Sequence, residues 1–101
     1  MPETDRRLYA RSYAQPRAAW AGMEWFRNFE RDAHDFAELG QTPLTMPVLV
    51  LAGEKSGGDF LVDQVELVAT NVQGQVVQGS GHWLMEEAPD AVIPAIIAFI
   101  D

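Results

Sequence analysis

The sequence contains no cysteine, which excludes disulfide bonds and thiolate chemistry and gives no sign of an oxidising compartment. It also lacks a long apolar run: the longest, PVLVLAG, is far shorter than the roughly 20 residues that a membrane span needs. The N-terminal stretch MPETDRRLYARSY has no apolar segment of the kind a signal peptide requires. From these absences we expect a cytoplasmic protein.

Basic residues are scarce, with seven Lys and Arg against fifteen Asp and Glu and a formal net charge of −8. Nucleic-acid binding needs clustered Lys and Arg to neutralise phosphates, so this function class is a poor fit. Most of the basic residues lie in the first third of the chain, but acidic residues interleave with them, which predicts a solvated helical surface. Two distant histidines and no cysteine offer no metal-ligand cluster, and we expect neither metal nor cofactor.

Apolar residues make up 48% of the 101 residues, which suits one small globular domain. Apolar spacing and the Gly and Pro breaks predict three helices, over residues 5–13, 17–28 and 30–39. A different pattern follows, and it predicts a strand over 46–53, a helix over 60–70, a strand over 72–79, the loop GSGHWLMEE and a terminal helix after it. Pro94 should kink that last helix or confine it to its final turns.

The stretch MPVLVLAG (46–53) is apolar on both faces, as a buried strand of a parallel sheet must be. The order strand, helix, strand, loop, helix predicts an α/β fold with a right-handed crossover. Two parallel strands cannot bury both faces and both edges by themselves, and exposed edges pair readily with another chain. We therefore expect an incomplete sheet that belongs to a larger assembly.

His82 stands between Gly81 and Trp83, a few residues past the carboxyl end of the second strand, where open α/β sheets bind their ligands. The flanking Gly79 and Gly81 allow the loop to turn sharply and aim the imidazole. Imidazole exchanges a proton near neutral pH, so His82 is a candidate general base. The structural alternative is a histidine that caps a helix or bonds a carbonyl.

The segment from MPVLVLAGEKSGG to NVQGQVVQGSGHWLMEEAPDAVIPAIIAFI resembles the C-terminal third of an α/β-hydrolase, of the branch with epoxide hydrolases and haloalkane dehalogenases. In that branch a G-x-G-H-W loop followed by E-x-P carries the catalytic histidine, which matches His82. The resemblance implies that residues 1–41 are the end of a helical cap. It implies that residues 42–101 are the C-terminal strand–helix–strand–loop–helix of the hydrolase core.

The resemblance also implies a mechanism. An aspartate nucleophile attacks an epoxide or halogenated carbon and forms an ester, and the histidine then activates the water that hydrolyses it. An acidic residue orients the histidine. The expected substrate of the full-length enzyme is a small apolar epoxide, ester or halogenated compound.

Several parts of this machinery are missing from the sequence. No G-x-D-x-G or G-x-S-x-G nucleophile motif occurs, and the oxyanion-hole segment is absent, so we expect the chain alone to be inactive. Relatives often carry their acid at the position of Ser56 in this chain. Asp59 is a weak candidate for the acid, Glu54 a weaker one, and some relatives supply the acid from an earlier strand.

The cap offers one further departure. Epoxide hydrolases often carry W-Y-R-N, whose tyrosine protonates the opening epoxide oxygen, whereas this chain has WFRN with Phe26 at that position. Trp25 and Phe26 are expected either to pack between helices, which we favour, or to line a substrate pocket. Trp83 is expected to be a packing anchor.

Three hypotheses therefore remain open. The chain is the histidine-bearing portion of a hydrolase, a non-catalytic α/β remnant that acts as an oligomerisation or binding module, or an intact small protein that dimerises by pairing exposed strand edges. The expected partners are a second copy of the chain or the missing N-terminal part of the hydrolase, and not nucleic acid or membrane.

Overall fold

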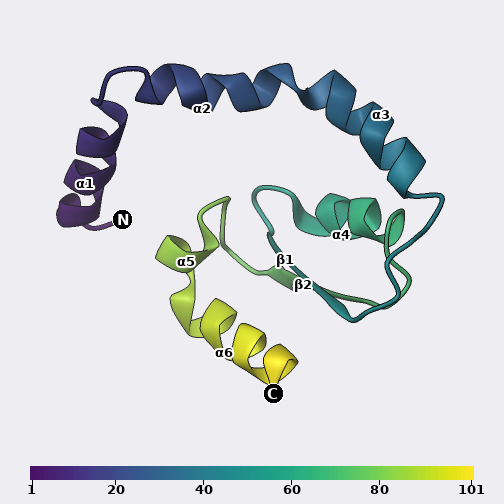
Figure 1. The fold of residues 1–101 in the computed structure, drawn as a ribbon. Coiled ribbons are helices and arrows are strands. Elements are labelled where there is room, and N and C mark those ends of the chain that lie inside the picture. Colours follow the sequence, from purple (N-terminus) through teal and green to yellow (C-terminus); the bar gives the residue numbers. More distant parts are fainter. The chain divides into compact units, whose positions relative to one another are not determined.

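The computed structural model describes residues 1–101, which form two compact units, residues 1–37 and 38–101. The first unit is entirely helical (Figure 1). It contains α1 (Glu3–Tyr13), α2 (Ala18–Arg27) and most of α3 (Phe29–Leu39).

The helices of the first unit bury none of their residues. Their charged side chains pair along each helix, as Arg7 does with Glu3 at 3.0 Å and Arg27 with Glu24 at 3.1 Å. Such exposed pairs contribute at most about 1 kcal/mol each. The basic residues thus lie on a solvated helical surface, as the interleaved charges predict.

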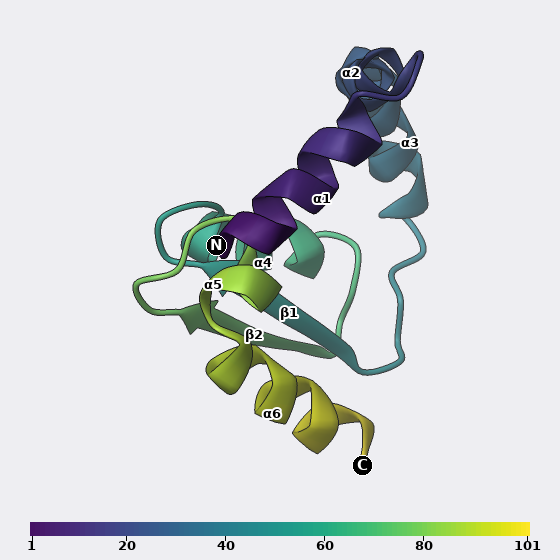
Figure 2. The ribbon, with the colours of Figure 1, turned by 90° about the vertical axis from the view of Figure 1, so that its left-hand side faces the viewer.

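The second unit holds β1 (Val48–Gly53), α4 (Gly58–Glu66), β2 (Val72–Val77), α5 (Leu84–Glu87) and α6 (Pro89–Ile100). The two strands pair in parallel, with a register that runs from Val48 opposite Val72 to Gly53 opposite Val77. The helix α4 covers one face of the sheet, and α6 lies on the other face, against β1 (Figures 1 and 2). This is the predicted α/β arrangement with an incomplete sheet.

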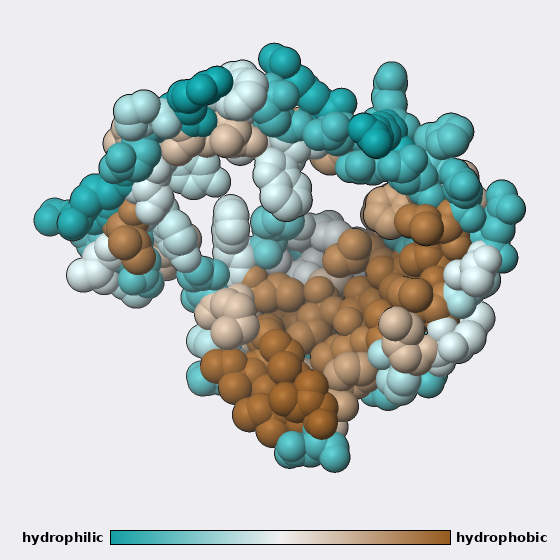
Figure 3. Space-filling model, viewed as in Figure 1, coloured by the Kyte–Doolittle hydropathy of each residue, from teal (hydrophilic) through white to brown (hydrophobic).

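The core of the second unit is small. Its buried apolar residues are Val50, Ala52, Ala69, Val77 and Val92. All four isoleucines of α6 are exposed, with Ile97 at 50% and Ile100 at 71%. Figure 3 shows the result as a broad hydrophobic surface over α6 and the region of the sheet. The second unit thus leaves much of its apolar surface uncovered.

Three details differ from the sequence-based expectation. The predicted helix over 60–70 ends at Glu66, because the chain then turns and pairs with Leu44 through a bridge to Ala69. The loop GSGHWLMEE contains a short helix, α5. The last helix continues through Pro94. Proline has no N–H, so the helix lacks one hydrogen bond, to the carbonyl of Asp90, an exposed residue near the start of the helix.

Candidate functional site

The histidine loop, residues 79–83, lies at the carboxyl ends of both strands. Gly79 has a φ of 73°, in the left-handed region that favours glycine, and it reverses the chain just after β2. Gly53, the last residue of β1, lies so close to the loop that a Cβ there would collide with the carbonyl oxygen of Gly81. The loop therefore sits directly against the end of β1.

Backbone and carboxylate groups hold this loop at several points. The carboxylate of Glu54, the residue after β1, accepts a hydrogen bond of 2.6 Å from the N–H of Gly79. The N–H of Lys55 donates to the carbonyl of Ser80 at 2.9 Å. The segment that follows β1 is thus tied to the segment that follows β2.

Glu87, at the end of α5, binds the loop from its other side. Its Oε2 accepts the N–H of Gly81 at 2.6 Å and its Oε1 accepts the N–H of Trp83 at 3.0 Å. The hydrogen bond from Gly81, and after it that from Trp83, lowers the pKa of the Glu87 carboxyl below its ordinary value. The ionised carboxylate can therefore accept both bonds at neutral pH.

His82 is exposed, and its ring has two neighbours. The Oγ of Ser56 lies 3.4 Å from its Nδ1, and the Trp83 ring meets the imidazole edge to face, with centroids 5.2 Å apart. No side chain of the chain hydrogen-bonds to Nε2. The imidazole is thus oriented from the Nδ1 side, which leaves the other nitrogen able to exchange a proton with a bound molecule.

The candidate acids take other places. Asp59 lies in the first turn of α4 and makes no hydrogen bond to His82. Glu54, the weaker candidate, binds the N–H of Gly79 instead. The group beside Nδ1 is the hydroxyl of Ser56, at the position where the resemblance puts an acid. A hydroxyl can orient the ring, but it cannot stabilise the imidazolium as a carboxylate does.

Sequence reasoning missed the role of Glu87 and gave Glu54 a different one. A signal for Glu87 is present in HWLMEE: an acidic side chain in the first turn of a helix can reach back to the N–H at its start. Glu87 does this with Trp83, the N-cap of α5. Nothing in the sequence indicates that Glu54 reaches a residue 25 positions away.

The aromatic residues are not packed as expected. Trp83 is 58% exposed, so it is not the packing anchor that the sequence suggests. Trp25 and Phe26 are 79% and 64% exposed, and the ring of Phe26 meets that of Phe29 edge to face. Burial of these rings needs surfaces that α2 and α3 do not supply within the first unit, and the helix packing that we favoured is wrong for this chain.

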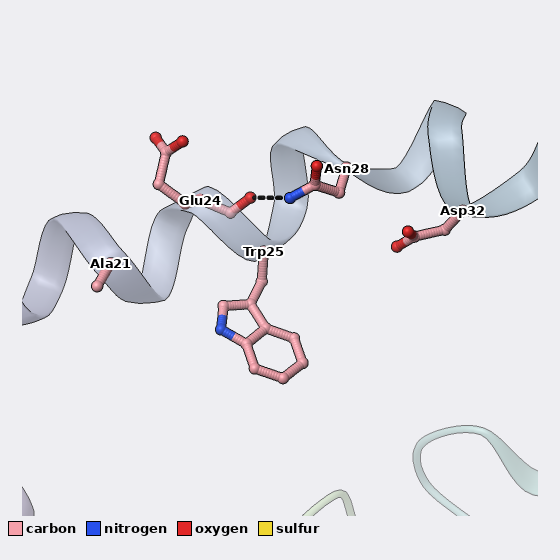
Figure 4. Close-up of a pocket in the computed structure, with 5 residues that line it drawn as sticks. All are labelled: Ala21, Glu24, Trp25, Asn28 and Asp32. Atoms are coloured by element: carbon pink, nitrogen blue, oxygen red, sulfur yellow. Dashed lines mark hydrogen bonds between the residues drawn. The ribbon is translucent and has the colours of Figure 1, made fainter.

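Trp25 lines an open hollow along α2 and α3, together with Ala21, Glu24, Asn28 and Asp32 (Figure 4). Its indole points away from the helix, while the amide of Asn28 donates to the carbonyl of Glu24 at 3.0 Å. This hollow is a feature of an exposed helix surface and brings no reactive groups together.

The chain places no three His, Asp or Glu side chains close enough to share a metal ion. None of its helices combines the length and the apolar character that crossing a membrane demands. At the histidine loop, by contrast, a chemically active side chain and the backbone around it are held by several groups.

The chain resembles known proteins in its sequence. The chain is 29% identical over 83 residues to epoxide hydrolase A of Mycobacterium tuberculosis (strain ATCC 25618 / H37Rv), a match that covers 78% of the chain and 26% of that protein. It is 31% identical over 97 residues to the soluble epoxide hydrolase of Corynebacterium sp. (strain C12), which covers 96% of the chain and 34% of that protein. No protein-family model matches the chain.

A search of solved structures finds the same fold. The crystal structure of Cfl2 wild-type from Burkholderia cenocepacia superposes on the whole chain with a TM-score of 0.86 and 24% sequence identity. The superposition covers 35% of that protein. The chain thus spans about a quarter to a third of the length of the proteins that it matches.

The chain has a partial α/β-hydrolase fold. Its sequence corresponds to the C-terminal part of epoxide hydrolases, so the resemblance predicted from the GSGHW loop and the strands before it is confirmed.

Proposed function

We propose that this chain is the histidine-bearing portion of an epoxide hydrolase-like enzyme, with His82 as the general base. The observation that carries the proposal is the held loop: an exposed imidazole at the carboxyl ends of two parallel strands, with its backbone bonded on both sides. Ligands of open α/β sheets bind at this edge. The curated relatives are named as epoxide hydrolases.

In this reaction an aspartate carboxylate, supplied by the rest of the enzyme, attacks a carbon of the epoxide. The C–O bond of the ring breaks, an ester bond forms, and the ring oxygen takes up a proton. His82 then accepts a proton from water as that water adds to the ester carbonyl. When the adduct collapses, the C–O bond to the diol breaks and the departing oxygen takes the proton from His82. The carboxyl group that remains loses the other water proton, which replaces the one that the ring oxygen took up, and the carboxylate is regenerated.

The chain alone is inactive under this proposal. It has no nucleophile motif, and Ser56, the nearest hydroxyl to His82, lacks the flanking residues of a nucleophile turn. Because Ser56 occupies the place beside Nδ1, we infer that the acid partner of His82 also comes from the remaining part of the enzyme.

The binding partner is that remaining part, and β1 is where it docks. The outer part of β2 is polar, with Gln73, Gly74 and Gln75 exposed, whereas the residues of β1 are buried or half-buried throughout. Polar residues are typical of an edge strand, and apolar ones of a strand with neighbours on both sides. A third strand therefore fits on the free edge of β1.

A second function, a non-catalytic binding module, is favoured by two observations. Phe26 has no hydroxyl to protonate an epoxide oxygen, and Ser56 stands in place of an acid. If these substitutions reflect lost catalysis, the chain still carries free strand edges and an exposed apolar helix through which it could associate.

A complementation experiment separates the two functions. The soluble epoxide hydrolase of Corynebacterium sp., shortened by the segment that this chain matches, is co-expressed with the chain, and diol formation from an epoxide is measured. We expect activity with the wild-type chain and not with His82→Gln. Because the ester forms before His82 acts, mass spectrometry should find the His82→Gln complex carrying one covalently bound substrate.

Matched controls make the result decisive. His34→Gln removes the other histidine, which lies exposed on α3, and should leave activity unchanged. A complex that forms but neither hydrolyses the epoxide nor accumulates the ester would reject the catalytic proposal and support the binding module.

A further inference from the structure

We propose that Glu87 is a positioning residue for His82, an inference that rests on the proposed function. Its carboxylate is divided between the two residues that flank the histidine: Oε2 binds the N–H of Gly81 at 2.6 Å, and Oε1 binds the N–H of Trp83 at 3.0 Å. The backbone is therefore fixed immediately before and immediately after His82 by a single side chain.

This arrangement limits the directions in which the imidazole can point. Bonds to the N–H groups of residues 81 and 83 restrict the backbone on both sides of His82, so the direction of its ring depends mainly on the side-chain torsions. Ser56 at Nδ1 and the Trp83 ring against the imidazole restrict these in turn. A general base must lie within hydrogen-bond distance of the proton that it takes, so rotation of this short segment changes the reaction rate.

The site is built to keep the carboxylate in place. Gly81 leaves room for it, since a Cβ at that position would lie 3.1 Å from both carboxylate oxygens. The N–H groups of the loop favour the ionised form of Glu87, and the charge of Lys55 acts in the same direction. Hydrogen bonds to a charged acceptor are stronger than those between neutral groups.

Glutamine at this position provides the sharpest test. Its side chain has nearly the same shape, but only its one carbonyl oxygen can accept a hydrogen bond, while its NH₂ group faces the second N–H as another donor. Glu87→Gln therefore releases one side of the histidine without leaving a cavity. Asp90→Asn is a matched control, because it neutralises a nearby carboxylate that lies in the first turn of the next helix, α6.

The first measurement follows the amide protons of Gly81 and Trp83 in the ¹⁵N-labelled full chain as the pH falls from 7 to 3. We expect both signals to shift together with one midpoint below the ordinary Glu value of about 4.3. Glu87→Gln should abolish this shared titration, and Asp90→Asn should retain it. Random-coil shifts at these two amides, or a shared titration that survives in Glu87→Gln, would overturn the proposal.

The second measurement uses the chain in the complementation assay. We expect Glu87→Gln to lower kcat about tenfold or more, the size of effect expected for loss of one hydrogen bond to a charged group, with KM changed less than about twofold. An unchanged kcat would show that Glu87 caps α5 without positioning His82. If the wild-type chain is itself inactive, the proposed function fails, while the amide titration still decides whether Glu87 holds the loop.

Discussion

The position of the histidine loop depends on the size of one residue, Gly53, and on the charge of another, Glu87. Gly53, at the end of β1, lies against the backbone of Gly81, and the carbonyl of Gly81 occupies the place that a side chain on residue 53 would need. Backbone cannot move aside as the tip of a flexible side chain can. At the residue scale, the position of His82 therefore depends on small residues as much as on the charged ones.

Gly53→Ala should destabilise the second unit by about 1–3 kcal/mol, the usual cost of overpacking. The added methyl group must displace the Gly81 carbonyl, and with it the bonds that Glu87 makes on both sides of His82. Urea denaturation followed by circular dichroism measures the change in the free energy of unfolding.

Gly22→Ala, within α2, is the control. The added Cβ would lie 3.4 Å from Tyr13, in ordinary contact, and the substitution should stabilise the helix by about 0.5–1 kcal/mol. Equal effects of the two substitutions would contradict the close approach.

Glu87 should make the stability of the loop depend on pH. Its pKa is lowered in the folded chain by the N–H groups of Gly81 and Trp83. Its contribution is therefore complete above the unfolded-state pKa of about 4.3 and is lost as the pH falls through the lower folded value. Between neutral and acid pH, the wild type should lose more stability than Glu87→Gln, as measured by urea midpoints at each pH. Parallel curves for the two proteins would contradict this assignment.

At the element scale, β1 and β2 differ in what their outer edges offer. The N–H groups of Val48 and Glu54 both point to β2, donating to Asn71 and Val77. Since donors alternate along a strand, the N–H of Leu51 points to the free edge of β1. By the same alternation, the N–H of Ala52 points to β2. In a parallel pair, the residue opposite such a donor turns its own N–H away, so the N–H of Val76, opposite Ala52, points to the outer edge of β2.

Proline substitution can test which edge is an interface. Leu51→Pro removes a donor from the free edge of β1 and keeps the pairing with β2, so it should weaken binding of the remaining hydrolase part at least about tenfold. Val76→Pro makes the matched change on the outer edge of β2 and should leave that binding unchanged. Isothermal titration calorimetry measures the affinity of each variant for the remaining hydrolase part. Weaker binding in Val76→Pro alone would mean that the third strand joins β2.

The elements also show how far the sequence could be interpreted. The order of helices and strands, the parallel pair and the site of His82 follow from apolar spacing and from the GSGHW loop. The short helix α5 could not be predicted from propensity, since four residues form a stable helix only when further contacts hold them, here the side-chain bond that Glu87 accepts from the N–H of Trp83. The exposure of Trp25 and Phe26 could not be predicted either, because an aromatic stripe does not indicate whether its packing partner is in the same chain.

At the scale of the whole molecule, apolar surface exceeds what the chain can bury. Five apolar residues form the core, none of them in α1, α2 or α3, while α6 and the free edge of β1 remain uncovered. Surfaces of this kind in soluble proteins mark sites of association. One unpaired edge can hold either a second copy of the chain or the remaining hydrolase part, but not both at once.

This competition leads to a prediction for the purified chain. Alone, it should elute as a dimer or larger species in size-exclusion chromatography with light scattering, because pairing of exposed strand edges satisfies their free backbone N–H and C=O groups. Addition of the remaining hydrolase part in equal amount should convert these species to a one-to-one complex, since a complementary third strand satisfies the same edge without a second copy. Leu51→Pro should weaken both forms of association, and Val76→Pro neither. A monomer that unfolds cooperatively on heating, in the absence of any partner, would show that the two strands are satisfied within the chain, and the docking surface assigned to β1 would be wrong.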